Sequence, residues 1–310
     1  MKNFKNILDV MKFFDTEEKC HKYLKSIFWK EGKKCPCCGS NKVMEYKSDF
    51  KKNRCYDCKS DFSIRKNTIF DDSRLPLQKW FMAIYLINSN KKGISSVNLA
   101  EQIGTTQKTA WYLLHRIRES FKTNFFNESI EGDVEIDETY IGGKDSNKHI
   151  GAKTQEKTII LGMVNRDTKQ VKAKKIDNVK FETLYKEIVR VVRCASTIIT
   201  DELQSYKKLK ALYIHKTVNH SKLEYSREDV RNWNREAFKV HTNTIEGFWS
   251  LFKRGVYGIY HWTSKKHIDN YVNEYSFKYN TKKMENNQRF LYYISNITNT
   301  KLTYKQLINR

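Results

Sequence analysis

Three acidic residues lie in or beside apolar segments of the sequence, where few neighbouring groups could balance the charge of a carboxylate. Asp137 lies in an alternating segment, EIDETYIGG, and Asp201 directly follows the apolar β-branched run of TIITDELQSY. Glu246 lies near the start of a helical segment, HTNTIEGFWSLFKRG. Because a buried carboxylate is costly unless a cation or hydrogen bonds take its charge, we expect these acids to lie together. Three such groups could hold two divalent ions about 4 Å apart, which activates one phosphoester oxygen and stabilises the other.

This acid set has open alternatives. Magnesium binds few carboxylates together with water and substrate phosphates, so a sparse set fits it. The chain has 35 acidic residues, however, and a group of solvated acids is the competing interpretation. Spacing does not exclude four neighbouring acids, which are Asp133, Glu135, Glu138 and Glu202. Asp133 and Glu135 share the period-2 face of Asp137, so the ligand could lie two or four residues earlier.

Two more residues come near Glu246 if its segment is helical. Lys253 follows Glu246 by seven residues, close to two turns at about 3.6 residues per turn. Asn243 precedes Glu246 by three residues and lies near the same face. A lysine there could hold a phosphate while the glutamate holds a metal. Asn243 stays an alternative to Glu246 as the third member of the set.

Five of the seven cysteines lie between positions 35 and 58. Cys35 and Cys38 form one C-x-x-C pair, and Cys55 and Cys58 form another after sixteen intervening residues. Two such pairs predict a four-thiolate zinc site, which is structural because no coordination position stays open for water. Cys37 lies inside the first pair and could compete as a ligand. Two disulfides are the alternative, which the absence of a visible secretory signal disfavours.

The segment from Gly93 to Ser120, GISSVNLAEQIGTTQKTAWYLLHRIRES, has the form of a helix-turn-helix. Gly104 makes the turn, and Thr105 or Thr106 caps the second helix. An ordinary helical hairpin is the competing interpretation. We expect four residues of the second helix to face outward, toward a DNA groove: Gln107, Lys108, Thr109 and Tyr112.

The charge of the chain favours a polyanionic partner. Lysine and arginine outnumber aspartate and glutamate by 58 to 35, which gives a formal net charge of +23. A field of this sign attracts nucleic acid and speeds encounter with it. The longest apolar run, residues 80–87, is too short to cross a bilayer, so we expect no membrane partner.

Hydrophobic spacing indicates the elements that must position these residues. Helical spacing over 7–29 predicts two short helices, and after residue 133 alternation predicts strands over 133–141, 158–164, 170–176, 196–200 and 213–218. Helices are predicted over 181–193, 244–254 and 264–279. The chain is therefore expected to be an α+β multidomain protein whose regions are a helical lead-in and zinc ribbon (1–70), a helix-turn-helix region (71–122), a mixed-sheet catalytic domain (132–285) and a basic C-terminal tail (286–310).

In these motifs the sequence resembles the bacterial insertion-sequence transposases of the DDE class, in the ISXO-like group with an N-terminal zinc ribbon. The matching stretches, which span most of residues 15–285 in the order of the family, are CPCCGS, RCYDCKSDFSIRKNTIFDDSRLPLQKWFMAIYL, KTAWYLLHRIR, EIDETYIGGK, TDELQSY and HTNTIEGFWSLFKRGVYGIYHWTSKKHIDNYVNEYSFKYN. The sequence departs from the family at Glu202, where many relatives have glycine.

The resemblance implies an RNase H-like catalytic domain in which Asp137, Asp201 and Glu246 bind two Mg²⁺ or Mn²⁺ ions. Lys253 is the downstream basic residue of the family. The implied reaction cleaves DNA at terminal inverted repeats, frees a 3′-hydroxyl and joins it to target DNA. Asn243 and Arg254 are further candidate DNA contacts.

Two ends must be cut together, so we expect a homodimer or higher oligomer on double-stranded DNA, in the bacterial cytoplasm at the nucleoid. Two other functions stay open. One is a DNA-binding protein without catalysis, and the other is a nuclease of the same fold without strand transfer.

Overall fold

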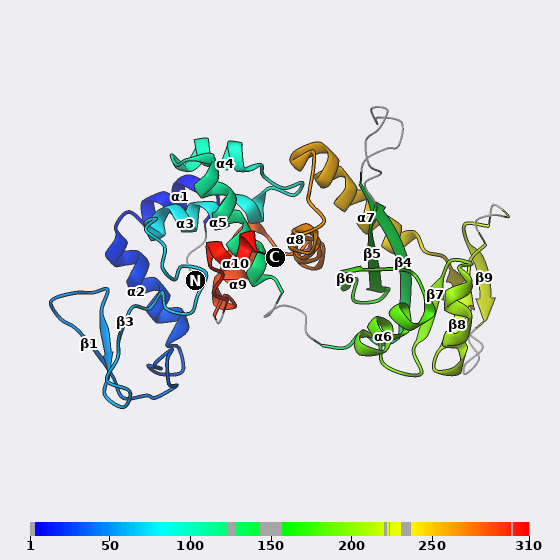
Figure 1. The fold of residues 1–310 in the computed structure, drawn as a ribbon, viewed down its shortest axis with the longest axis horizontal. Coiled ribbons are helices and arrows are strands. Elements are labelled where there is room, and N and C mark those ends of the chain that lie inside the picture. Colours follow the sequence, from blue (N-terminus) through cyan, green and yellow to red (C-terminus); the bar gives the residue numbers. More distant parts are fainter. Residues whose placement is uncertain are drawn as a thin grey trace. The chain divides into compact units, whose positions relative to one another are not determined.

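The computed structural model describes residues 4–122, 128–142, 157–219, 222, 224–230, 237–298 and 300–309 (Figure 1). These residues form two compact units. The first, called the N-terminal unit, combines the described residues before 126 with those from 281 onward. The second, called the sheet unit, comprises the described residues between 126 and 280. None of the helices among the described residues is long and apolar enough to span a membrane.

The N-terminal unit begins with two short helices and a small three-stranded sheet. As expected, residues 7–29 form α1 (Ile7–Phe13) and α2 (Glu17–Phe28). The antiparallel sheet that follows consists of β1 (Val43–Glu45), β2 (Asn53–Cys55) and β3 (Asp61–Phe62). A short turn region then leads to the apolar helix α3 (Leu77–Ser89), which begins directly after Pro76. Its buried face includes Trp80, Phe81 and Ile84.

The helix-turn-helix region forms at the predicted place, as α4 (Ser96–Ile103) and α5 (Gln107–Ser120). Gly104 adopts a left-handed conformation with a φ of +61°, which a residue with a side chain rarely adopts, and so closes α4. Thr106 caps α5 by accepting a hydrogen bond from the amide of Thr109 at 3.3 Å. The two helices pack against α3, whose Lys79 donates a hydrogen bond to the Gly104 carbonyl at 2.5 Å.

The C-terminal residues differ from the expected basic tail. They form α9 (Asn286–Ser295) and α10 (Tyr304–Ile308), although Asn299 and Arg310 lie outside the described residues. Apolar side chains of this segment are buried in the N-terminal unit: Phe290, Tyr293, Ile294, Ile297, Leu302 and Leu307. The first three recur at helical spacing, and burying them outweighs the solvation of the polar residues that surround them in sequence.

The sheet unit contains a mixed five-stranded sheet with the strand order β6-β5-β4-β7-β8. The strands are β4 (Asp133–Ile141), β5 (Thr158–Asn165), β6 (Val171–Ile176), β7 (Thr197–Thr200) and β8 (Ile214–Thr217). The first three strands form an antiparallel meander, and β7 and β8 then add in parallel on the other side of β4. This is the RNase H-like arrangement, and each strand lies within two residues of its predicted bounds.

Helices cover both faces of this sheet and define two cores. One face packs against α6 (Phe181–Val191) and the 3₁₀ helix η2 (Gln204–Ala211) through residues such as Val134, Ile136 and Leu184. The opposite face packs against α7 (Asn243–Gly255) and α8 (Ile268–Asn280). Ile141, Ile160 and Phe248 belong to this second core. Alternate residues of β4 therefore face different helices, as the pleat of a strand requires.

Two elements of the sheet unit did not follow from the periodicity. A two-stranded antiparallel sheet of β9 (Arg227–Val230) and β10 (Ala237–Val240) lies between β8 and α7. Both strands have only four residues and β9 is mostly polar, so they lack a clear alternation of apolar residues. A π-helical turn, η4 (Val256–Tyr260), directly extends α7.

The contact between α7 and α8 leads to a prediction about stability. A Cβ built on Gly255 would lie 1.6 Å from the hydroxyl oxygen of Tyr275, which is fully buried in α8. We therefore expect Gly255→Ala to lower the free energy of unfolding by about 1–3 kcal/mol through overpacking. The measurement is the midpoint of urea unfolding, monitored by circular dichroism.

Gly247 provides the matched control on the same helix. A Cβ at Gly247 meets nothing within 4 Å, so Gly247→Ala should raise stability by about 0.5–1 kcal/mol through helix propensity. Adding Tyr275→Phe should recover part of the loss in Gly255→Ala. An unchanged midpoint for Gly255→Ala would contradict the close packing described here.

Candidate functional site

The acidic residues of β4 point to opposite faces of the sheet, because side chains alternate along a strand. Glu135 and Asp137 lie on the face that packs against α7, because their neighbours Val134 and Ile136 belong to the core under α6. Glu138 lies on the α6 side with those two apolar residues. Glu135 and Asp137 therefore share one face of the sheet, as their spacing in the sequence predicts. Only their hydrogen-bond partners distinguish the two residues.

Glu135 is fully buried and engaged at both carboxylate oxygens. Its Oε2 accepts hydrogen bonds from the amides of Thr244 and Ile245, at 2.8 and 2.9 Å, in the first turn of α7. Its Oε1 accepts a hydrogen bond from Arg166 Nε at 2.7 Å. The positive end of the helix dipole and the guanidinium together balance the buried charge. Glu135 thus joins α7 to β4, and few of its lone pairs remain for a metal.

Asp137 has a more open environment. Its Oδ2 accepts a hydrogen bond from Trp249 Nε1 at 2.9 Å. Burial raises the pKa of Asp137 to about 6, and the negative charge of Asp201 and, less strongly, of Glu246 contributes. The indole hydrogen bond works in the opposite direction. Asp201 and Glu246 therefore each lie within electrostatic reach of Asp137.

Asp201 and Glu246 reach this site from two other elements. Asp201 directly follows β7, the parallel neighbour of β4, and its Oδ1 accepts a hydrogen bond from the amide of Leu203 at 3.1 Å. Glu246 lies in the first turn of α7, where its Oε1 accepts a hydrogen bond from the hydroxyl of Thr242 at 2.7 Å. Glu246 is solvent-exposed and can therefore reach a ligand from outside.

Glu138 adds a fourth acid beside the set. Its pKa is raised to about 7, chiefly by burial and with contributions from the charges of Asp201 and Asp137, whereas a hydrogen bond donated by Tyr206 lowers it. Tyr206 is itself fully buried in η2. Glu138, one of the neighbouring acids that spacing did not exclude, thus lies within electrostatic reach of Asp201, on the opposite face of β4 to Asp137.

The donor set at this site fits hard divalent cations. It is made of carboxylates, the groups that Mg²⁺ and Mn²⁺ prefer, and the pKa of Asp137 is raised first by burial and then by the charges of Asp201 and Glu246. In the described part of the chain, the acids do not form a group of three or more ligands within 4.8 Å of one another. This spacing is wider than the ligand set of a single ion, and two ions about 4 Å apart would need ligands that are spread more widely.

The other residues predicted near Glu246 also lie on α7. Lys253 is half-buried in the last turn of the helix, and Arg254 beside it is exposed, with its Nε bonded to the Ser250 carbonyl at 3.2 Å. Asn243 is exposed at the first residue of the helix. Glu246 lies near enough to Asp137 for its charge to contribute to the raised pKa of that residue, and Asn243 stays the alternative third member.

The predicted DNA-facing side of α5 is partly occupied by the protein itself. Gln107 and Lys108 are exposed, and Thr109 is half-exposed. Tyr112 is half-buried, and its hydroxyl donates a hydrogen bond to the carbonyl of Leu302 at 2.8 Å. The Tyr112 hydroxyl is therefore already bonded within the protein, because the C-terminal segment packs onto that part of α5, and a role of Tyr112 in DNA contact stays a prediction. The ring of Tyr304 in α10 lies against Tyr112 and under the Lys108 ammonium group.

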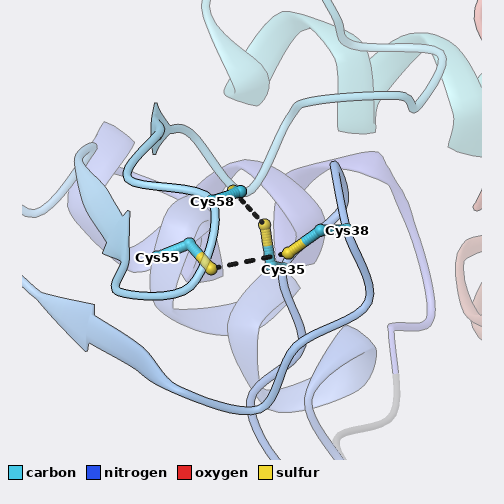
Figure 2. Close-up of side chains that lie close together, drawn as sticks. All are labelled: Cys35, Cys38, Cys55 and Cys58. Carbon is cyan, nitrogen blue, oxygen red and sulfur yellow. Dashed lines mark hydrogen bonds between the residues drawn. The ribbon is translucent and has the colours of Figure 1, made fainter.

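The four predicted cysteines converge on one point (Figure 2). The sulfurs of Cys35 and Cys58 are 3.7 Å apart and those of Cys38 and Cys55 are 3.6 Å apart, and all four lie within 4.8 Å of one another. Thiolates around tetrahedral zinc, at about 2.3 Å from the ion, are separated by about 3.8 Å. The cluster therefore fits a structural zinc ion.

The two loops that carry the cysteines share a local geometry. Gly39 and Lys59, the residues after the second cysteine of each pair, have φ angles of +76° and +54°. The amide of Cys37 points at Cys35 Sγ, at 3.4 Å, so Cys37 contributes its backbone to the first loop. The Cys37 side chain is exposed and lies outside the group of four.

Sequence patterns missed two residues of the acid site. Trp249 was hidden within an aromatic stripe at helical spacing, which is typical of a core residue. Arg166 follows β5 and reaches Glu135 across 31 positions of sequence, and no local pattern points to that pairing. The only signal for Arg166 in the sequence is that it is a basic residue just after a predicted strand.

Comparisons with known proteins match both units. Residues 15–61 match the transposase zinc-ribbon domain, and residues 129–280 match the ISXO2-like transposase domain. The chain is 25% identical over 265 residues to an uncharacterized protein in the transposable element ISH50 of Halobacterium salinarum, which covers 79% of this chain and 84% of that protein.

A solved structure of the simian T-cell lymphotropic virus intasome, in complex with the PP2A regulatory subunit B56 gamma, is similar at 14% identity with a TM-score of 0.29. It covers 63% of this chain and 68% of that one. The two domain matches, in this order and on the units that carry the cysteine cluster and the acid site, show that the chain belongs to the ISXO2-like transposases with an N-terminal zinc ribbon.

Proposed function

We propose that this protein cleaves DNA at the terminal inverted repeats of its insertion sequence, frees 3′-hydroxyl ends and joins them to target DNA. The proposal is carried by the inferred convergence of Asp137, Asp201 and Glu246 on one metal site, and it is supported by their places in a strand, directly after the neighbouring strand and in the first turn of a helix. The raised pKa of Asp137, to which both other acids contribute, supports this convergence.

In this proposal Asp137, Asp201 and Glu246 hold two Mg²⁺ or Mn²⁺ ions. When bound by these residues, the ions would supply an activated oxygen nucleophile and would neutralise charge on the scissile phosphate. Lys253, two turns along α7 from Glu246, holds a neighbouring phosphate of the substrate. Glu135 keeps α7 against β4, so the three acids stay in register while substrates exchange.

The DNA would be held by exposed residues of both units. Gln107, Lys108 and Thr109 at the start of α5 are the candidate base contacts, and Asn243 and Arg254 are candidate contacts near the acid site. The net charge of +23 supports strong, salt-dependent phosphate binding. Because two ends are cut together, the proposed active form is a dimer or a higher oligomer on double-stranded DNA in the cytoplasm, at the nucleoid.

Zinc has a separate role in the proposal. One Zn²⁺ bound by the thiolates of Cys35, Cys38, Cys55 and Cys58 would hold the two loops of the small sheet together. Only three side chains from this region belong to the buried cluster around it, Cys35, Cys55 and Phe62. So small a core needs a metal to stay folded.

The first prediction concerns the acid site. Wild-type protein with Mg²⁺ should nick labelled DNA that carries the element's end and should also give joined products. Asp201→Asn should lower the nicking rate by at least about a hundredfold, because one charge that compensates the cations is lost. The measurement is product formation on a denaturing gel.

Glu202→Gln is the matched control, since it removes an exposed acid one residue away. It should nick at a rate close to wild type. Nicking without joined products, and without preference for the repeat, would indicate a nuclease of the same fold. Tight binding with no nicking by any variant, with both ends supplied, would indicate a DNA-binding protein without catalysis.

The second prediction concerns the cysteines. Purified wild-type protein should contain one zinc ion per chain by elemental analysis. Cys38→Ser should lose most of this zinc on dialysis against a weak chelator, because three thiolates bind zinc far less tightly than four.

Cys37→Ser changes the exposed neighbouring thiol and should keep one zinc per chain. If instead Cys37→Ser lost zinc and Cys38→Ser kept it, the ligand set described here would be wrong.

A further inference from the structure

The indole of Trp249 lies in a slot beside Asp137. Trp249 is 4% exposed and donates a hydrogen bond from Nε1 to Asp137 Oδ2 at 2.9 Å. Asp137 is paired in the sheet with Gly162 of β5, directly opposite on the same face. The position that a side chain on β5 would occupy next to Asp137 is therefore filled by the ring of a residue from α7.

Gly162 is what makes this slot. A Cβ built there would lie 2.5 and 2.7 Å from Cζ2 and Cη2 of Trp249 and 2.9 Å from Cδ1 of Ile245. These distances are shorter than van der Waals contact, so any side chain would displace the indole. Glycine is needed here for space, because α7 approaches the middle of β5 closely.

The hydrogen bond has a specific chemical consequence for Asp137. An indole N–H is a neutral donor with no acceptor, so it can fix one carboxylate oxygen without competing for a cation. With Oδ2 bonded to Trp249, the carboxylate cannot rotate freely about its χ2 axis. The other oxygen, Oδ1, is then presented in a defined direction.

The same contact couples two of the acids. Trp249 follows Glu246 by three residues on α7, so the two side chains project from neighbouring positions on one helix face. Glu135 holds the first turn of α7 to β4, and Trp249 holds the next turn to the same strand. Glu246 lies between these two attachments.

We propose that Trp249 is a positioning residue for metal binding, and that Gly162 is required because it makes room for the indole. Trp249 orients the Asp137 carboxylate and fixes the turn of α7 that carries Glu246. The inference rests on the proposed function, which makes Asp137 and Glu246 metal ligands.

The test measures Mn²⁺ binding to the full chain by electron paramagnetic resonance of the free ion, without DNA and without turnover. Trp249→Phe keeps an aromatic ring and removes the N–H, and it should weaken Mn²⁺ binding at the acid site by about tenfold or more. Gly162→Ala keeps the indole but displaces it, and it should weaken binding in the same direction. Circular dichroism checks that each variant is folded.

Two controls separate positioning from packing. Phe248→Leu removes volume from the same core on the same helix, so it should lower stability without changing Mn²⁺ affinity. Trp262→Phe changes a tryptophan that is 65% exposed and should change neither property.

Asp137→Asn and Asp201→Asn are the references for the site itself, and both should abolish this binding. If they abolish it and folded Trp249→Phe binds Mn²⁺ as wild type does, the positioning role is overturned while the metal site stands. If neither reference variant changes Mn²⁺ binding, both the metal site and the inference built on it are overturned.

Discussion

The buried carboxylate of Glu135 is the interaction on which the geometry of the acid site depends. It joins the middle strand of the sheet to the first turn of α7 and to Arg166, with no solvent contact. Arg166 in turn donates hydrogen bonds to the carbonyls of Lys239 and His241, the residues that lead into α7. Removing one partner of such a buried pair typically costs about 3–5 kcal/mol, because the other charge is left uncompensated. The position of Glu246 relative to Asp137 follows from this anchor.

The sheet separates acids that hold the fold from acids that stay available. Glu135 has its charge balanced by a cation and a helix terminus, whereas Asp137 faces two other acids. A carboxyl whose pKa is raised by folding, as that of Asp137 is, costs stability once the pH exceeds its unfolded value. At neutral pH the ionised Asp137 therefore carries a cost, first from its burial and second from the neighbouring acids, that a bound cation would relieve. Glu135, whose charge is balanced, and Asp137, whose charge is not, thus lie only two residues apart on one strand.

Much of this arrangement could be predicted from local patterns. The strands that carry Asp137 and Asp201, the helix that carries Glu246 and the two cysteine pairs each have a short-range signal in spacing or composition. The distinction between Glu135 and Asp137 has no such signal, because the partners that separate them lie 31 and 109 residues away. The role of the C-terminal residues from 286 onward was also hidden. Their polar and basic residues suggested a solvated tail, although Phe290 and Tyr293 are fully buried.

The N-terminal unit is built from both ends of the chain, and the sheet unit is inserted between them. Arg289 in α9 donates a hydrogen bond to the carbonyl of Asn88 at 2.7 Å, and Tyr112 in α5 bonds to Leu302. During synthesis the sheet unit can therefore fold as soon as it emerges, whereas the N-terminal unit lacks α9 and α10 until the residues after 285 have been made. The unit whose synthesis begins first is thus completed after the sheet unit, so a chain that stops near residue 285 would contain a complete sheet unit and an incomplete N-terminal unit.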